Sequence, residues 1–339
     1  MNISNGRVGH SRRSVRGVTL VELMVAMLIG LLVTVGAVGI FMTNRKSYAA
    51  TESLGRVQEG ARMAFELMAR DIRDADGTPC AQPGPAVAGQ APMLPMANVV
   101  VSTDWWNNWA DGLVGFDNGG LATTVAGTDA IELHSASDDV ISVNTYASNA
   151  FTLTRPASDF AADDVVVACD NTQASVFRIA APSGSVITVS DNTTKNCSQN
   201  LGVGPSCGAF PYAYSSAGKP AMVAKLNAVR WYVKANGRGG NSLYRRVLDR
   251  ESEILDGIST PVAGNGGLQL SYLIDGATTY VNSTTITAAN NWKRVKAVRI
   301  QLEFEGQQDN DADAIKAGTD GKGLRRSIRH VVSLRNRTS

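Results

Sequence analysis

The sequence predicts an α+β protein, in which one long N-terminal helix packs on the antiparallel β-sheet of a globular domain. Two patterns predict this class. An apolar run continues as a helically spaced stripe as far as residue 76, and short strand-like runs recur after it. The composition, 44% hydrophobic and 18% charged, is that of a folded chain, and the 33 glycines suit many turns between strands.

Residues 18–44 are predicted to form the first half of the helix and to cross a membrane. No charged residue occurs between Leu23 and Asn44, and these 22 residues would span about 33 Å as a helix, enough for a bilayer core. A secretory signal peptide would have a shorter apolar region. A plain membrane anchor has the required length, but it explains Glu22 only as a carboxylate that the helix dipole favours in the first turn.

Residues 1–17 form a basic leader with four arginines and no acidic residue. Removing these four from the 32 basic residues leaves 28 against 30 acidic ones, so the basic balance of the chain is confined to the leader. A basic N-terminus favours the cytoplasmic side of a membrane. The balanced remainder gives no reason to expect a nucleic-acid partner.

Residues 45–76 are predicted to continue the helix as an amphipathic second half. Apolar residues recur every three or four positions, which places them on one face that would pack on the following domain. Gly77 and Pro79 are typical of a helix end. The stripe consists of Leu54, Val57, Ala61, Ala64, Met68, Ile72 and Ala75.

Residues 77–339 are predicted to form a β-rich globular domain. In the run 298–305, residues Val298, Ile300, Leu302 and Phe304 alternate with polar ones and should share a buried face. The runs 229–234 and 242–248, joined by a glycine-rich turn, read as a hairpin. Other strand-like runs occupy 97–101, 130–134, 164–168, 175–180 and 185–190.

Four cysteines, Cys80, Cys169, Cys197 and Cys207, suggest two disulfides if the domain is exported. Cys197 and Cys207 are the most local pair and would leave Cys80 for Cys169, but four cysteines permit three pairings. The chain has no CxxC pair and only three histidines, so we expect no zinc site.

A run of alternate aspartates, Asp309, Asp311 and Asp313, is a candidate calcium loop. An EF-hand loop has Gly at its sixth position and usually Glu at its twelfth, where this chain has Ala314 and Asp320. A solvated acidic loop is therefore the preferred interpretation.

No sequence motif indicates catalysis or a cofactor. No serine lies in a G-x-S-x-G elbow, and neither a Walker A loop nor a dinucleotide fingerprint is present. His134 and His330 lie in strand-like runs, where structural roles are commoner, so we expect a non-enzymatic protein without cofactors. The cluster Trp105, Trp106 and Trp109 is expected in the core or at a subunit interface rather than at a ligand site.

The segment from Gly17 to Glu22, between the basic leader and the long apolar run, resembles the processing signal of type IV prepilins and pseudopilins. The resemblance implies that a prepilin peptidase cuts after Gly17 and that the new N-terminus, Val18, is N-methylated. This family usually has phenylalanine at that position. Glu22 would then be the fifth residue, and its carboxylate would pair with the Val18 ammonium of a neighbouring subunit, which sets the register of packed helices.

Residues 55–80 resemble the PilW family of minor pilins, through Arg56, Gln58, Glu59, Arg62 and Ala64, then Arg70-Asp71-Ile72-Arg73 and Cys80. The hairpin ANGRGGNSLYRR and the C-terminal HVVSLRNR resemble the same family. The major pilins commonly have a proline in the apolar helix, and this chain has none between Val18 and Thr78, which favours a minor subunit or a pseudopilin.

These resemblances imply a minor pilin that takes part in priming a type IV pilus and in its tip complex, with roles in adhesion, twitching motility and DNA uptake. Expected partners are other minor pilins, the major pilin, the prepilin peptidase and the inner-membrane assembly machinery. The chain would cross the inner membrane once, with its N-terminus cytoplasmic, before entering the fibre. Two alternatives stay open: a type II secretion pseudopilin of the GspJ kind, and an exported enzyme or receptor that is merely anchored by the helix.

Overall fold

The computed structural model describes residues 17–80, 94–107, 109, 111–215, 219–262, 266–305 and 325–337. The chain forms two compact units, Met1–Glu52 and Ser53–Ser339. The helix α1, Leu20–Asp74, contributes residues to both units.

In the first unit, residues 20–45 of α1 are exposed on every side. Leu20–Arg45 is long and apolar enough to cross a membrane. The hydroxyls of Thr34 and Thr43 donate to the carbonyls of Gly30 and Gly39 one turn earlier, at 2.5 and 2.9 Å, so their polar atoms are satisfied within the helix. The segment can therefore meet an apolar environment on all sides.

In the second unit, the C-terminal part of α1 buries the predicted apolar face. Ala61, Ala64, Met68, Ile72 and Ala75 are each fully buried. The helix ends at Asp74, two residues before the predicted end, because Asp76 adopts a left-handed backbone conformation with a φ of 63°. The side-chain amide of Asn336 donates to the carbonyls of Asp74 and Ala75, which the helix itself leaves unpaired.

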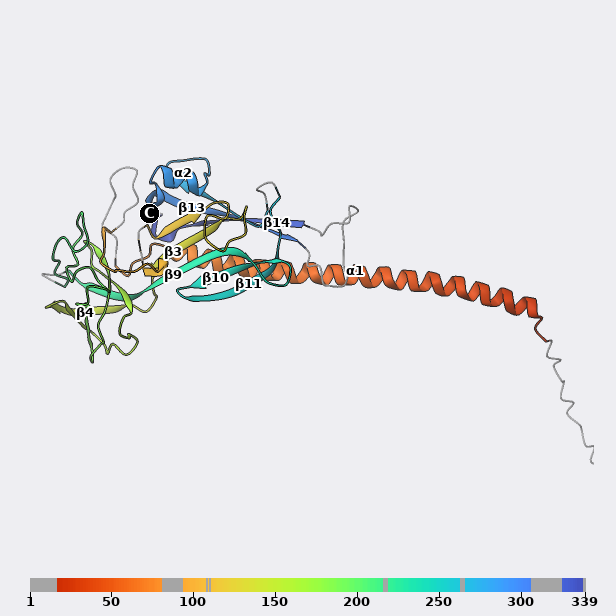
Figure 1. Cartoon of the computed structure of the whole chain (residues 1–339), viewed down its shortest axis with the longest axis horizontal. Coiled ribbons are helices and arrows are strands. Elements are labelled where there is room, and N and C mark those ends of the chain that lie inside the picture. Colours follow the sequence, from red (N-terminus) through yellow and green to blue (C-terminus); the bar gives the residue numbers. More distant parts are fainter. Residues whose placement is uncertain are drawn as a thin grey trace, which may run out of the picture. The chain divides into compact units, whose positions relative to one another are not determined.

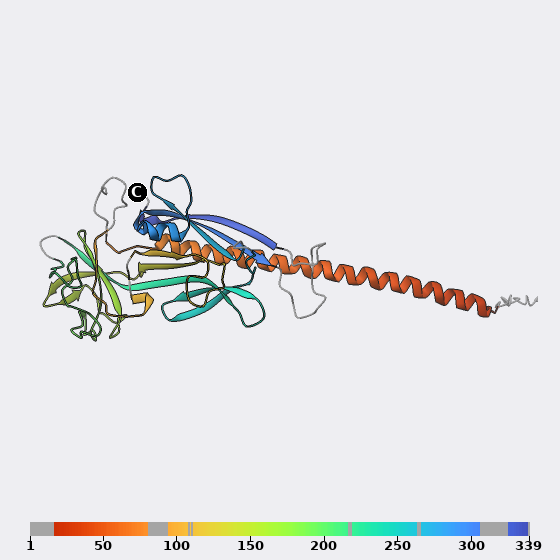
Figure 2. The same ribbon diagram turned by 45° about the horizontal axis from the view of Figure 1, so that its top comes forward.

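The sheet of the second unit surrounds one long strand, β9 (Ala221–Ala235), which Figures 1 and 2 show passing from the region of β4 to the β10–β11 hairpin. Around its C-terminal half lie β2 (Leu113–Phe116), β3 (Ala130–Ala136), β10 (Asn241–Val247), β11 (Arg250–Ile258), β12 (Leu268–Ile274), β13 (Val295–Glu305) and β14 (Arg325–Ser333). Around its N-terminal half lie β1 (Met96–Asn98), β4 (Ile141–Ala147), β5 (Ala150–Leu153), β6 (Val165–Cys169), β7 (Ala174–Arg178) and β8 (Val186–Thr188).

These two groups of strands have separate cores. The group that includes β10–β14 packs with α1 around Trp231, Tyr272 and Phe304, and we call it the helix lobe. The group that includes β4–β8 packs around Phe151, Phe177 and Tyr214 without α1, and we call it the outer lobe. Short helices η1 (Trp105–Asn107), α2 (Ser283–Ala288), η2 (Trp292–Arg294) and η3 (Arg335–Arg337) complete the described elements.

The structure confirms the predicted α+β class, and its strand pairs are mostly antiparallel. On β13, Val298, Ile300, Leu302 and Phe304 are buried while the residues between them are half-buried, as the alternation predicts. The predicted hairpin is formed by β9 and β10, which pair from Ala235 with Asn241 to Val229 with Val247. One pair departs from the antiparallel prediction: β1 runs parallel to β7.

Candidate functional site

The start of α1 carries the residues that the sequence predicts to be processed. Gly17, Val18 and Glu22 are exposed. The backbone N–H of Thr19 donates to the Glu22 carboxylate at 3.3 Å, and the Glu22 N–H donates to the Thr19 hydroxyl oxygen at the same distance. This reciprocal arrangement is a capping box, which satisfies two of the N–H groups that a helix start leaves unpaired.

The capping box gives Glu22 a local role that the sequence interpretation did not include. The same carboxylate also accepts the Thr19 hydroxyl at 3.4 Å. These contacts are intramolecular and lie at the exposed start of an apolar helix. A positively charged group of another molecule can therefore still approach the carboxylate. A pairing between subunits would therefore compete with, or add to, hydrogen bonds that Glu22 already accepts.

Beyond Glu22, the first unit presents a long apolar surface. The exposed fraction of Leu23 is 52% and that of Phe41 is 66%, and the residues between them are exposed as well. Exposed apolar patches of this extent mark surfaces that contact lipid or protein. The N-terminal segment therefore combines an exposed carboxylate with an uncovered apolar helix.

A second candidate site lies at the other end of α1, where half-buried and buried charged side chains join the helix to the helix lobe. Asp71 accepts two hydrogen bonds from the Arg245 guanidinium on β10, each at 2.8 Å, and a third from the Trp231 indole on β9 at 2.7 Å. Paired, charge-assisted bonds of this kind fix orientation as well as energy. Sequence reasoning did not identify this contact.

Just past the helix, Asp76 and Arg337 form an ion pair at 3.1 Å, and both side chains are almost completely buried. Burial raises the pKa of Asp76, and the charge of Arg337 opposes that rise. The Arg337 guanidinium also donates to the carbonyls of Asp111 and Trp292. The C-terminal segment therefore closes over the end of α1 through Asn336 and Arg337.

The anchor at the end of α1 brings together three segments that are far apart in the sequence. Asp71 belongs to residues 55–80, Arg245 to the ANGRGGNSLYRR hairpin and Arg337 to HVVSLRNR. The end of α1, the hairpin and the C-terminal segment therefore meet at one place in the second unit.

The four cysteines form two disulfides, Cys80–Cys169 and Cys197–Cys207. Cys80 and Cys169 are buried, and their bond ties the segment after α1 to the end of β6. Cys197 and Cys207 are exposed and close a short loop of the outer lobe. The two bonds therefore differ in surroundings as well as in the length of chain that they close.

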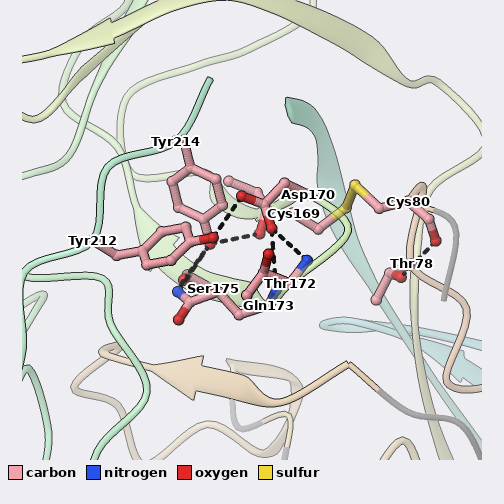
Figure 3. The surroundings of a disulfide bond; sticks show 10 residues. Thr78, Cys80, Cys169, Asp170, Thr172, Gln173, Ser175, Tyr212 and Tyr214 are labelled. Carbon is pink, nitrogen blue, oxygen red and sulfur yellow. Dashed lines mark hydrogen bonds between the residues drawn. A yellow bond between two sulfur atoms is a disulfide. The ribbon is translucent and has the colours of Figure 1, made fainter. Parts of the chain in front are cut away.

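A buried polar network lies beside the Cys80–Cys169 bond (Figure 3). Asp170 accepts the Thr172 N–H at 2.7 Å and the Tyr212 hydroxyl at 2.6 Å. Gln173 donates to the Leu201 carbonyl at 2.7 Å, which joins β7 to the loop that carries the second disulfide. Burial is the largest cause that raises the pKa of Tyr212, to about 12, so its hydroxyl stays protonated and can donate at physiological pH.

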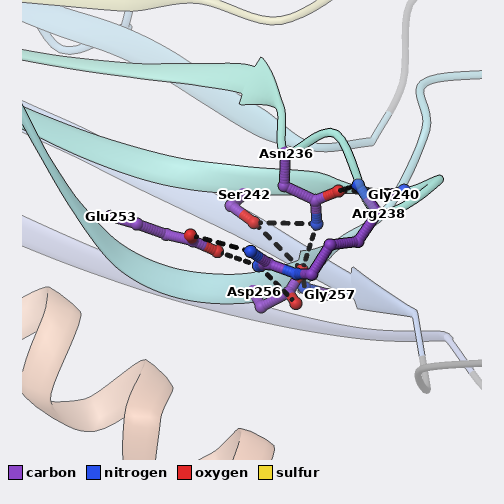
Figure 4. Close-up of polar contacts among 7 residues, drawn as sticks. All are labelled: Asn236, Arg238, Gly240, Ser242, Glu253, Asp256 and Gly257. Atoms are coloured by element: carbon purple, nitrogen blue, oxygen red, sulfur yellow. Dashed lines mark hydrogen bonds and ion pairs between the residues drawn. The ribbon is translucent and has the colours of Figure 1, made fainter. Parts of the chain in front are cut away.

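The tip of the β9–β10 hairpin is held by a polar cluster (Figure 4). Arg238 pairs with Glu253, and with Asp256 at 2.9 Å. Asn236 donates to Asp256 at 2.7 Å and to the Ser242 hydroxyl at 3.1 Å. Gly237 and Gly239 have positive φ angles of 74° and 89°, which explains the glycines of this turn. Glu253 and Asp256 belong to β11, so Arg238 and Asn236 tie the tip of the hairpin to that strand.

The histidines and tryptophans have packing roles. His134 is buried, and its ring nitrogen lies 3.2 Å from the Trp105 carbonyl. Burial lowers the pKa of His134 to about 4, so this ring is neutral at physiological pH. His330 lies against Phe65 of α1, with ring centroids 4.6 Å apart. Trp109 is buried, which confirms a core position, whereas Trp105 and Trp106 are half-buried.

The candidate calcium residues Asp309, Asp311 and Asp313 lie outside the described residues. Within the described part of the chain, no group of three or more histidine, cysteine, aspartate or glutamate side chains is placed to hold a metal ion.

Comparison with known proteins identifies one family model. Residues 12–38 match the prokaryotic N-terminal methylation motif, a type IV pilin-like prepilin signal. No curated protein and no solved structure matches the chain significantly. The motif supports the class of type IV pilins and pseudopilins, and with the apolar helix it fits a membrane-anchored structural subunit rather than an enzyme.

Proposed function

We propose that the chain is a minor pilin of a type IV pilus, made as a prepilin that a prepilin peptidase cuts after Gly17. The observation that carries the proposal is the coincidence of the methylation motif at 12–38 with an uncovered apolar helix whose first turn presents Glu22. The leader would stay cytoplasmic, the helix would cross the inner membrane, and the domain would be exported.

Cleavage after Gly17 would create an ammonium group at Val18, one residue before the capping box. In a bundle of apolar helices, this charge and the Glu22 carboxylate are each unfavourable alone, since the surroundings solvate neither. Pairing between neighbouring subunits would satisfy both groups and set their axial register. Thr19 would hold Glu22 in place until that partner arrives.

The anchor at the end of α1 supports the finer assignment to a PilW-like minor pilin. It consists of the pairs Asp71–Arg245 and Asp76–Arg337, which come from the three segments with the PilW resemblance. A minor pilin must transmit the position of its helix to its exposed domain, and buried, hydrogen-bonded charges fix such a connection. In this role the chain would join other minor pilins in the complex that primes the pilus fibre and stays at its tip.

A type II secretion pseudopilin of the GspJ kind is the alternative within the same class, because the signal and the apolar helix serve both systems. The absence of proline from Val18 to Thr78 fits both. Deletion of the gene separates them: loss of surface pili and of twitching motility identifies a pilus subunit, whereas loss of exoprotein secretion with normal pili identifies a pseudopilin.

The proposal is tested by the intact mass and N-terminal sequence of the membrane-extracted protein, from cells with and without prepilin peptidase. We expect a chain that begins at methylated Val18 only when the peptidase is present. A substitution Gly17→Leu should leave the leader attached, while Arg16→Gln is a matched change beside the site that keeps the glycine. A chain that still begins at Met1 in peptidase-positive cells, or one cut beyond residue 44, would refute the prepilin assignment.

A further inference from the structure

The two disulfides of the second unit differ in their access to solvent. The exposed fraction of Cys80 is 9% and that of Cys169 is 0%, whereas Cys197 and Cys207 are both exposed. A disulfide is reduced when a thiolate reaches one of its sulfur atoms, and exposed disulfides are the labile or regulatory ones. While the domain is folded, another protein can therefore reach the Cys197–Cys207 bond but not the Cys80–Cys169 bond.

The Cys197–Cys207 bond closes a short surface segment, residues 197–207, which we call the disulfide loop. Its cysteines are 10 positions apart in the sequence, against 89 for Cys80 and Cys169. Residues 203–206 of the loop are exposed. A bond that closes a short loop restricts the unfolded chain less than one that closes a long loop. Opening it should therefore disturb the loop rather than the whole domain.

The first part of the disulfide loop is held to the outer lobe independently of its bond. The Leu201 carbonyl accepts the Gln173 amide at 2.7 Å and the Ser175 hydroxyl at 2.6 Å, and both donors are buried. The Cys197 N–H donates to the Val99 carbonyl at 2.9 Å. Buried hydrogen bonds are costly to lose, so these contacts should persist when the disulfide opens.

The second part of the disulfide loop depends on the bond. Among the described residues, the one hydrogen bond to the backbone of residues 204–207 is local, from the Ala209 N–H to the Ser206 carbonyl at 3.2 Å. The Cys207 Sγ lies 3.9 Å from the Asn98 carbonyl oxygen, at the end of β1. The disulfide therefore holds an exposed segment, which has few other contacts, beside β1.

We propose that the Cys197–Cys207 bond is a redox-sensitive switch, opened by a protein dithiol of the thioredoxin type in the compartment to which the domain is exported. One thiolate of the dithiol attacks a sulfur of the bond, forms a mixed disulfide and releases the other cysteine as a thiolate, which takes up a proton. The second thiol of the dithiol then loses its proton and attacks the mixed disulfide. The dithiol is thereby oxidised to a disulfide, and Cys197 and Cys207 become two thiols.

Reduction frees residues 204–207 and leaves the Cys80–Cys169 bond intact. The inference rests on the export of the domain in the proposed function, and it holds for a pilus and for a pseudopilus subunit. Its test does not depend on cleavage after Gly17, so the failure of one proposal is distinguishable from the failure of the other.

The test uses the full-length protein in micelles of a non-ionic detergent, with reduced thioredoxin as the protein dithiol. Iodoacetamide labels the new thiols, and peptide mass mapping locates them. Labelling of Cys197 and Cys207 should be about 100-fold faster than that of Cys80 and Cys169, because the buried bond is reached only after the lobe opens. In denaturant all four cysteines should be labelled, which is the control for the activity of the reductant.

Hydrogen exchange distinguishes a switch from a structural bond. After reduction, the amides of residues 203–209 should exchange about tenfold faster or more, while residues 165–178 of β6 and β7 keep their protection. The double variant Cys197→Ser with Cys207→Ser should show the same pattern without reductant and no further change with it.

Three results would overturn the proposal: equal labelling of the two pairs, no labelling of Cys197 and Cys207 without denaturant, or unchanged exchange in the disulfide loop after reduction. Faster exchange throughout β6 and β7 would also overturn it, because the bond would then stabilise the whole outer lobe.

Discussion

The two parts of α1 differ in how they use the same helical backbone. From Leu20 to Arg45, side chains are exposed all round, and the hydroxyls that occur are satisfied within the helix. From Ala61 to Ala75, one face is fully buried while Arg62 and Glu66 remain exposed on the other. A helix that is apolar all round needs an apolar solvent or identical neighbours, whereas one with a single apolar face needs only its own domain. The first part is therefore specialised for a change of surroundings and the second for a fixed attachment.

The largest expected effect concerns the fixed attachment. Arg337→Met leaves Asp76 buried without its counter-charge and should lower the free energy of unfolding by about 4 kcal/mol. Denaturant titration followed by tryptophan fluorescence measures this loss, since all five tryptophans lie in the second unit. The double variant Arg337→Met with Asp76→Asn should recover part of the loss. If the double variant is no more stable than the single one, the buried charge of Asp76 is not the cause.

Two side-chain truncations, one in each part of α1, test the difference between the parts most directly. Ile72→Ala removes a fully buried side chain and should cost about 3 kcal/mol in the same titration. Leu31→Ala removes a side chain that is 66% exposed in the first unit and should leave the unfolding of the domain unchanged. An equal loss in both variants would show that the first part of α1 also stabilises the domain, which would break the distinction.

His134 on β3 and Asp129, the residue before that strand, have opposite pH dependence. Burial lowers the pKa of His134 from 6.5 to about 4, so its contribution to stability is lost as the pH falls through this window. Burial raises the pKa of Asp129 from 3.8 to about 6, so its contribution is gained as the pH falls from about 6 to 4. The two effects therefore oppose each other as the pH falls.

Removing one of these groups should reveal the other. Between pH 7 and pH 4, the stability of His134→Gln relative to the wild type should rise by up to about 3 kcal/mol, from 1.36 kcal/mol per pKa unit. Asp129→Asn should change in the opposite direction over the same range. Denaturant titrations of the three proteins at both pH values measure these differences, and parallel pH profiles would contradict the opposing effects of His134 and Asp129.

The smallest effect is expected at the start of α1. Thr19→Ala removes one side of the capping box and should destabilise the first turn by about 1 kcal/mol. Hydrogen exchange at the amides of Glu22 and Leu23, which donate to the Thr19 hydroxyl and carbonyl, should accelerate about fivefold, the rate equivalent of that energy. Thr19→Ser keeps the hydroxyl and serves as the control. Unchanged exchange in Thr19→Ala would mean that Glu22 is not held by this cap.

Local periodicity predicted the parts of the fold that depend on neighbours in the sequence. The apolar face around Met68 and Ile72 and the alternation along β13 follow from residues three, four or two positions apart. The helix end was placed at 76 instead of Asp74, because the left-handed Asp76 and the Asn336 cap are not visible in the helical pattern. The division of the sheet into two lobes along β9 was not predicted either.

The anchor contacts could not be predicted because they join residues far apart in the chain. Asp71 and Arg245 are separated by 174 positions, and Asp76 and Arg337 by 261. A polar Asp71 beside a buried stripe was the one available signal, and nothing local indicates which arginine meets it. The capping box, in contrast, follows from the three-residue spacing of Thr19 and Glu22 and could be predicted from the sequence.

The Cys80–Cys169 bond has a mechanical consequence. In the proposed fibre, the subunit would carry tension between its helix and the surface or partner that its domain contacts. Hydrogen-bonded strands can be pulled apart one pair after another, but a disulfide yields only when a covalent bond breaks. Cys80 follows α1, and Cys169 ends β6 in the outer lobe. A force on that lobe would therefore be transmitted to the helix through the disulfide. The strands of the helix lobe, and the Asp71 and Asp76 pairs with them, are thereby relieved of part of the load.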